Sequence, residues 1–175
     1  MRMKMFFAAI LISGLLFSTG CQKIKSLADV NISADYTIDL NLTVLQKAFK
    51  GSTTIDPVTN SQVSKYLKLI KLWKVDNING SFKNVSKPAI LKTGTITFSS
   101  DAGTATWTTT NLKIINGGVF SLDNAQGQWD KVAQILSTKK PFTISIKGTT
   151  DTDGFTFTMS LKIATTFTAN PFGTN

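Results

Sequence analysis

Near the C-terminal end of the chain, apolar and polar residues alternate without a break from residue 155 to residue 167. One face of this run holds Phe155, Phe157, Met159, Leu161, Ile163, Thr165 and Phe167. A period of two is typical of a half-buried β-strand. At about 3.3 Å per residue, a strand of this length spans roughly 40 Å. We therefore expect a long strand at the centre of a β-sheet.

Residues 142–148 alternate in the same way and supply a partner for this strand. Phe142, Ile144 and Ile146 share one face. The intervening Asp153-Gly154 pair is a favoured tight turn between antiparallel strands. The pattern predicts a hairpin of these two strands.

Further strands are expected along the rest of the chain. Residues 35–44 alternate cleanly, and residues 93–99 and 104–110 flank a Ser-Asp-Ala-Gly turn signal, which predicts a second hairpin. Residues 75–85 read as a strand, although Asn79-Gly80 is also a turn signal. Residues 50–60 are rich in Gly, Ser, Thr, Pro and Asn, so they predict a loop.

Two helices are expected. In residues 61–74, apolar residues recur at three- and four-residue spacings with lysines between them, and Asn60 or Ser61 is a suitable cap. The second half of this segment also fits a strand. In residues 124–137 a similar apolar face includes Trp129, and Asp123 with Gln126 resembles a capping box.

This order of elements predicts an α+β fold. We expect a mainly antiparallel, twisted sheet of about six strands covered by two helices, because strands and helices do not alternate as a doubly wound fold requires. The alternative is a β-sandwich or open barrel with two helices at its rim. One domain is expected over residues 28–170, followed by a flexible tail at residues 171–175.

The N-terminal residues have the composition of a secretory signal. Arg2 and Lys4 precede an uncharged apolar run, MFFAAILISGLLF, which is too short to span a membrane as a stop-transfer helix. Ser18-Thr19-Gly20 then places small residues directly before Cys21, the one cysteine of the chain. The sequence predicts a signal peptide over residues 1–20.

The Ser18-Thr19-Gly20-Cys21 junction resembles the lipobox of bacterial lipoproteins. The resemblance implies cleavage between Gly20 and Cys21 and a covalent lipid, such as palmitate, on Cys21. Residues 21–27 would be a short tether, which would hold the domain close to the membrane. Acidic residues after the cysteine act as a surface-export signal in some such families, and here Lys23 and Lys25 stand there instead. The expected location is the cell envelope, with the protein anchored in the outer membrane and facing the periplasm.

The charge inventory excludes some classes of partner and of chemistry. The chain has no histidine, all of its 10 acidic residues are aspartates, and Arg2 is its one arginine. Loss of Arg2 and Lys4 with the signal lowers the formal net charge from +9 to +7. We expect no nucleic-acid partner, because the protein is exported and lacks the bidentate arginines that favour base and phosphate recognition.

Without histidine or glutamate, and with its cysteine assigned to the anchor, the chain offers few catalytic groups. Two aspartate pairs remain: Asp35 with Asp39 on one strand face, and Asp151 with Asp153 in a turn. A solvated strand face and a hairpin turn are the simpler interpretations of these pairs. We expect no catalytic residue, no metal site and no cofactor apart from the lipid.

Binding is the remaining class of function. The first hypothesis is a non-enzymatic, membrane-anchored lipoprotein with a structural or protein-binding role. The second is a carrier or sensor of a hydrophobic, lipid-like ligand, and the third is an aspartate-dependent enzyme acting on glycans. The residues expected to form a ligand-binding or membrane-facing surface are Trp73, Trp129, Lys65, Lys68 and Lys71.

Overall fold

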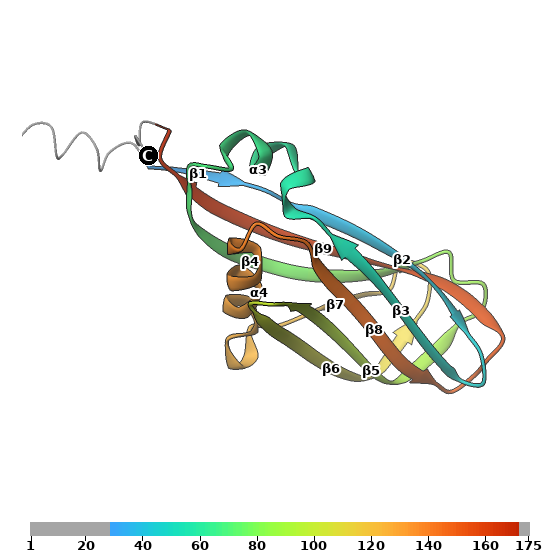
Figure 1. Cartoon of the computed structure of the whole chain (residues 1–175). Coiled ribbons are helices and arrows are strands. Elements are labelled where there is room, and N and C mark those ends of the chain that lie inside the picture. Colours follow the sequence, from blue (N-terminus) through green and yellow to red (C-terminus); the bar gives the residue numbers. More distant parts are fainter. Residues whose placement is uncertain (1–28, 172–175) are drawn as a thin grey trace, which may run out of the picture.

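Two antiparallel β-sheets packed face to face make up the described part of the chain, residues 29–171 of a computed structural model (Figure 1). The strands are β1 (Val30–Ser33), β2 (Tyr36–Val44), β3 (Ala48–Ile55), β4 (Ile70–Lys83), β5 (Ala89–Ser100), β6 (Gly103–Ile114), β7 (Val119–Ser121), β8 (Phe142–Thr150) and β9 (Phe155–Ala169). The helices are α3 (Ser61–Tyr66) and α4 (Gln128–Ser137), with short 3-10 turns at Pro57–Thr59 and Ala125–Gly127.

The first sheet is built around β9. Strands β1 and β2 follow one another along one edge of β9, and β4 pairs along its other edge, with β7 beyond β4. The second sheet has the strand order β3-β8-β5-β6. All of the pairings in both sheets are antiparallel.

The pairing is that of one long hairpin rolled into two sheets. Strand β2 pairs with β9, β3 with β8, β4 with β7 and β5 with β6, so the chain folds back on itself around the β5–β6 turn. Rolling adds a second set of contacts, β4 with β9 and β5 with β8, which closes each sheet. This winding is the jelly-roll arrangement of a double-sheet sandwich.

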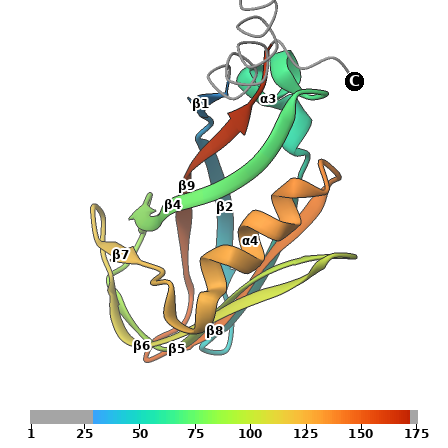
Figure 2. The same ribbon diagram turned by 90° about the vertical axis from the view of Figure 1, so that its left-hand side faces the viewer.

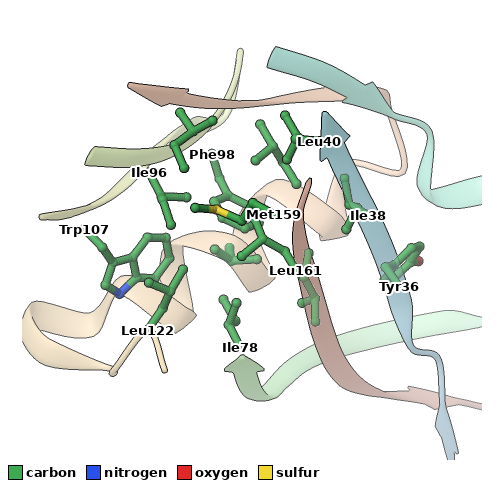
Figure 3. Packing of buried hydrophobic residues seen from close by; sticks show 14 of the residues in the cluster. Tyr36, Ile38, Leu40, Ile78, Ile96, Phe98, Trp107, Leu122, Met159 and Leu161 are labelled. Atoms are coloured by element: carbon green, nitrogen blue, oxygen red, sulfur yellow. The ribbon is translucent and has the colours of Figure 1, made fainter. Parts of the chain in front are cut away.

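Alternating side chains from both sheets form the core. Strand β2 alternates buried and exposed residues along its whole length, and its Ile38 and Leu40 stand opposite Leu161 and Met159 of β9. Figure 3 shows Met159 pointing from the first sheet toward Ile96 and Phe98 of the second. These inward faces are apolar because the two sheets exclude water from the layer between them.

Helix α4 closes one open side of the sandwich. It packs against β4 of the first sheet and β6 of the second (Figure 2). Its Val132, Ile135 and Leu136 are fully buried. At its start the Gln128 side chain accepts a hydrogen bond from the Thr106 backbone N–H of β6, at 3.0 Å. The helix therefore provides a hydrogen-bond acceptor for a backbone N–H of an edge strand, and it also covers the apolar interior between the two sheets.

The expected single sheet covered by two helices is wrong. Within residues 29–171, nine strands form two sheets, so the domain is mostly β rather than α+β. Helix α4 bridges both sheets, and α3 is only 6 residues long. The error arises because a period of two says which residues face inward and nothing about which sheet a strand joins. The long strand at residues 155–167 and the hairpin on either side of residues 100–103 are confirmed as β9 and as β5–β6.

The expected hairpin of residues 142–148 with the long strand is also wrong. Strand β8 pairs with β3 and β5, whereas β9 lies in the other sheet, so the Asp153-Gly154 segment crosses between the sheets. The loop expected at residues 50–60 is wrong in its first half, because β3 continues to Ile55. Its Gly51 faces inward under Leu42, where a close approach of the two sheets leaves no space for a side chain.

The expected helix over residues 61–74 ends early. Asn60 caps α3 by accepting hydrogen bonds from the backbone of Gln62 and Val63, as predicted, but β4 begins at Ile70. The second half of this segment forms a strand because Trp73 pairs with Phe167 of β9, and this tertiary pairing outweighs a modest helical preference. The segments expected as signal peptide, residues 1–20, and as tether, residues 21–27, lie outside the described residues, as do residues 172–175 of the expected tail.

Gly148 lies opposite Phe49 of β3, among closely packed neighbours from its own sheet. The Phe49 ring lies over it and meets Phe157 of the first sheet edge to face, with ring centroids 5.3 Å apart. A methyl group at position 148 would stand 2.7 Å from the Phe49 ring and 2.7 Å from the Thr93 backbone oxygen. Since a carbonyl of a neighbouring strand cannot move freely, the site accepts glycine alone.

We expect Gly148→Ala to lower the free energy of unfolding by about 1–3 kcal/mol through overpacking. Chemical denaturation followed by tryptophan fluorescence measures this change. Ser52→Ala, on an exposed position of β3, is the control and should change the free energy by less than about 0.5 kcal/mol. Equal effects of the two variants would contradict the packing argument.

Tyr36 is a buried titratable group at the start of β2. Its hydroxyl donates a hydrogen bond to the Pro57 carbonyl at 3.3 Å. Burial raises the pKa of Tyr36 well above its ordinary value, and the Asp56 carboxylate raises the pKa further. The unfolded chain therefore ionises first as the pH rises, so this residue's contribution to stability is present below about pH 10 and is lost above it.

We expect Tyr36→Phe to remove this alkaline loss. Between about pH 10 and 11.5, the stability of the variant relative to the wild type should rise by up to about 1.4 kcal/mol per pH unit. Denaturation curves at a series of pH values provide the measurement. Parallel pH profiles of the two proteins would show that Tyr36 ionises equally in the folded and unfolded states.

Candidate functional site

The outward side of the second sheet is covered with hydroxyl groups. Its residues occupy alternate positions on all four strands, and their side chains are exposed or half-buried. We call this surface the hydroxyl face, and it comprises Ser52, Thr54, Thr93, Thr95, Thr97, Ser99, Thr104, Thr106, Thr108, Thr110, Thr143, Ser145 and Thr149, with Lys50 and Lys147 among them.

Strand register orders these groups in rows across the sheet. Ser52 stands opposite Ser145, which stands opposite Thr97, which stands opposite Thr106. Neighbouring strands lie about 4.8 Å apart and same-face residues about 6.8 Å apart along a strand. Some of the hydroxyls form hydrogen bonds with each other. The Oγ1 atoms of Thr97 and Thr106 are 3.3 Å apart, and those of Thr93 and Thr149 are 2.8 Å apart.

Two hollows share the middle of the hydroxyl face, and a third, of about 540 Å³, lies beside Ser99 and Thr143. The larger of the first two, of about 640 Å³, is lined by Thr43, Leu45, Ala48, Phe49, Lys50, Thr93, Thr95, Lys147, Gly148 and Thr149. The other, of about 560 Å³, is lined by Lys50, Gly51, Ser52, Thr95, Thr97, Ser145, Ile146 and Lys147. Because Lys50, Thr95 and Lys147 line both hollows, the two hollows adjoin at this row, and we call the adjoining pair the trough.

Two lysines stand side by side at the middle of this trough. Lys50 of β3 is directly opposite Lys147 of β8, so both ammonium groups project from the same row of the sheet. Neither has a hydrogen-bond or ion-pair partner in the described part of the chain, and no aspartate lines either hollow. Like charges directly opposite each other destabilise a sheet, so this arrangement is unfavourable by itself.

On the outer side of the first sheet, in contrast, lysines lie beside aspartates. Lys162 pairs with Asp35 at 2.9 Å, and Lys83 lies 3.8 Å from Asp39. Asp76 pairs with Lys74 at 2.9 Å, and a hydrogen bond from Thr166, followed by the one from Lys74, lowers the pKa of Asp76. Charges on the first sheet are therefore locally compensated, and those at the centre of the hydroxyl face are not.

The structure separates the two tryptophans of the expected ligand surface. Trp73 is buried against Phe167, with ring centroids 5.3 Å apart, and its indole nitrogen has no hydrogen-bond partner among the described residues. Trp129 lies in the first turn of α4 and donates a hydrogen bond to the Leu122 carbonyl at 2.8 Å. The two indole rings therefore have different packing and hydrogen-bond surroundings. The two rings serve as separate packing groups.

The three expected lysines share one end of the molecule but no helical face. Lys65 is on α3, where its ammonium group lies 5.1 Å from the centre of the Tyr66 ring. Lys68 follows the helix, and Lys71 is on β4, paired with Asp29 at 2.8 Å. All three are exposed. A role of this surface against a membrane stays a prediction.

Three of the four aspartates in the two expected pairs have partners of their own. Asp35 and Asp39 each pair with a lysine of the first sheet, and Asp151 accepts a hydrogen bond from the Ile90 backbone N–H at 2.8 Å. Within residues 29–171, no three histidine, cysteine, aspartate or glutamate side chains come together to hold a metal ion. No helix of that same part of the chain is both long and apolar enough to cross a membrane.

Sequence reasoning missed the hydroxyl face. The signal that could have found it is the placement of Thr or Ser at every second position in residues 93–99 and 104–110, and at all but Lys147 of the alternate positions in residues 143–149. The opposition of Lys50 and Lys147 has no such signal, because it depends on the register of two strands that lie far apart in the chain.

Comparison with known proteins identifies no family for this chain. No family model matches it, and no curated protein matches it. Solved structures with some likeness include one of Desmodium yellow mottle tymovirus, at 10% identity and TM-score 0.37, covering 84% of this chain and 91% of that one. The decameric BFDV capsid protein has 9% identity and TM-score 0.38, covering 79% of this chain and 99% of that one. Scores this low add nothing to the strand pairing described above.

We expect Lys50→Gln to relieve the repulsion on the hydroxyl face. The free energy of unfolding should rise by about 0.2–1 kcal/mol at low ionic strength, and the gain should fade in high salt because salt screens exposed charges. Lys83→Gln, which removes a lysine near Asp39 on the first sheet, is the matched control and should give no gain. A salt-independent effect of Lys50→Gln would contradict the charge explanation.

Proposed function

We propose that this protein is a lipid-anchored lipoprotein of the bacterial cell envelope that acts as a non-enzymatic binding module. The observation that carries the proposal is the sequence before Cys21: two basic residues, a short apolar run and Ser18-Thr19-Gly20. The lipid on Cys21 would hold the protein at the outer membrane, facing the periplasm.

The position of the anchored end supports this proposal. Asp29 is eight residues after Cys21, and an extended chain of that length reaches at most about 29 Å. Asp29 is paired with Lys71, close to the exposed Lys65, Lys68 and Leu72. Basic residues near an anionic membrane contribute about 1 kcal/mol each, so this end is suited to face the lipid surface.

The binding role is supported by the contrast between the aspartates and the interior, whose groups are engaged within the protein, and the hydroxyl face, whose groups are open to solvent. Asp35, Asp39 and Asp151 are engaged in ion pairs or backbone hydrogen bonds, and the interior between the sheets is filled by packed apolar side chains. The hydroxyl face, by contrast, presents polar groups and uncompensated charge to solvent. A surface of this kind is a natural place for a ligand or partner to dock.

Cys21→Ser tests the anchor. In cells fed a radioactive or clickable palmitate, the wild-type protein should carry the label and sediment with membranes, whereas Cys21→Ser should lack the label and leave the membrane fraction. Gln22→Ser introduces the same residue at the neighbouring position and should keep the label. Label on Cys21→Ser, or membrane retention of the unlabelled variant, would overturn the proposal that Cys21 is the attachment point.

A further inference from the structure

We infer that the hydroxyl face binds an extended acidic polysaccharide, with its carboxylate groups placed against Lys50 and Lys147. The inference names the ligand class for the binding role proposed above, and rests on that role. It does not depend on the lipid, because the trough belongs to the folded domain.

Charge complementarity is the first argument. Lys50 and Lys147 stand directly opposite each other with no carboxylate in either hollow, although four lysines of the first sheet, Lys71, Lys74, Lys83 and Lys162, lie near aspartates. An anionic group between the two ammonium groups would turn a repulsive pair into two charge-assisted contacts. The face therefore favours an anion at this row.

The shape of the trough favours an extended polymer. Hollows of about 640 and 560 Å³ lie on either side of the lysine row and share Thr95. A single small anion would occupy the row and leave both hollows empty. A linear chain can fill both hollows in succession while its acidic group sits at the lysines.

The lining matches the chemistry of sugars. Thr95, Thr97 and Ser145 offer hydroxyls that donate and accept hydrogen bonds, as the hydroxyls of a sugar do. The larger hollow is also lined by Leu45, whose exposed apolar side chain is suited to the C–H face of a sugar ring. No arginine is present among residues 29–171, and no aromatic ring other than Phe49 lines the trough, so stacked nucleic-acid bases have little to bind.

The location of the trough argues against a membrane as its partner. The larger hollow is lined by Thr43, Leu45 and Ala48 beside the turn between β2 and β3. Strand β1 lies at the opposite end of the domain from this turn (Figure 1). Strand β2, which runs between these two ends, is 9 residues long and spans about 30 Å. The lysine pair is therefore separated by about that length from the end of the domain that precedes β1.

The test uses the protein as isolated from cells, whether acylated or not, and a linear oligomer of galacturonic acid as the probe. Isothermal titration calorimetry should detect binding of this oligomer and none of a neutral dextran of equal length. Lys50→Gln with Lys147→Gln should weaken binding by about tenfold or more, since two charge-assisted contacts are lost.

The control is Lys83→Gln with Lys162→Gln, which removes the same two charges from the first sheet and should leave binding within about twofold, because distant surface charges are screened. Thr95→Val with Thr97→Val keeps the charge and shape and should also weaken binding several-fold.

Equal weakening by the two lysine double variants, or no binding to the oligomer, would overturn the inference. So would binding of phosphatidylglycerol vesicles or of an acidic peptide at Lys50 and Lys147 in preference to the oligomer. None of these results depends on acylation, so failure here leaves the anchor proposal standing.

Discussion

Strand β9 is the element on which the sandwich depends. It pairs with β1 and β2 along one edge and with β4 along the other, so it connects the two halves of the first sheet. Its inward residues also reach the second sheet, where Phe157 meets Phe49 edge to face over the glycine at position 148. Hydrogen bonding within one sheet and packing between two sheets are thus joined in a single strand, which links the register of one sheet to the position of the other.

Rolling the chain around this strand gives the two outer faces different characters. The first sheet carries aspartates opposite lysines, as Asp35 with Lys162 shows, and its charges are compensated within the protein. The second sheet carries hydroxyls and an uncompensated pair, Lys50 and Lys147. A protein that needed only solubility would gain nothing from placing two lysines opposite each other, because scattered charges serve that purpose without repulsion. The asymmetry is the physical basis for assigning a binding role to the second sheet.

The two proposals concern different parts of the molecule and different forces. Anchoring would come from a covalent lipid near the start of β1, aided by exposed lysines such as Lys65 and Lys68. Ligand binding would come from the trough near the β2–β3 turn, through charge and hydroxyl groups. Since β2 separates these regions by its length, a ligand can be held away from the membrane while the protein stays attached to it.

Local periodicity by itself determined which residues of β2, β5, β6 and β9 face inward. The turn at residues 100–103 was also determined locally, because turn geometry is encoded within a few residues. The short sequence before Cys21 likewise carries the expectation of an anchor. Only the tertiary structure decided that β8 and β9 belong to different sheets, that residues 70–74 are strand, and that Lys50 meets Lys147. These outcomes depend on pairing between distant segments, and a residue's neighbours in the chain hold no information about which distant strand it will face.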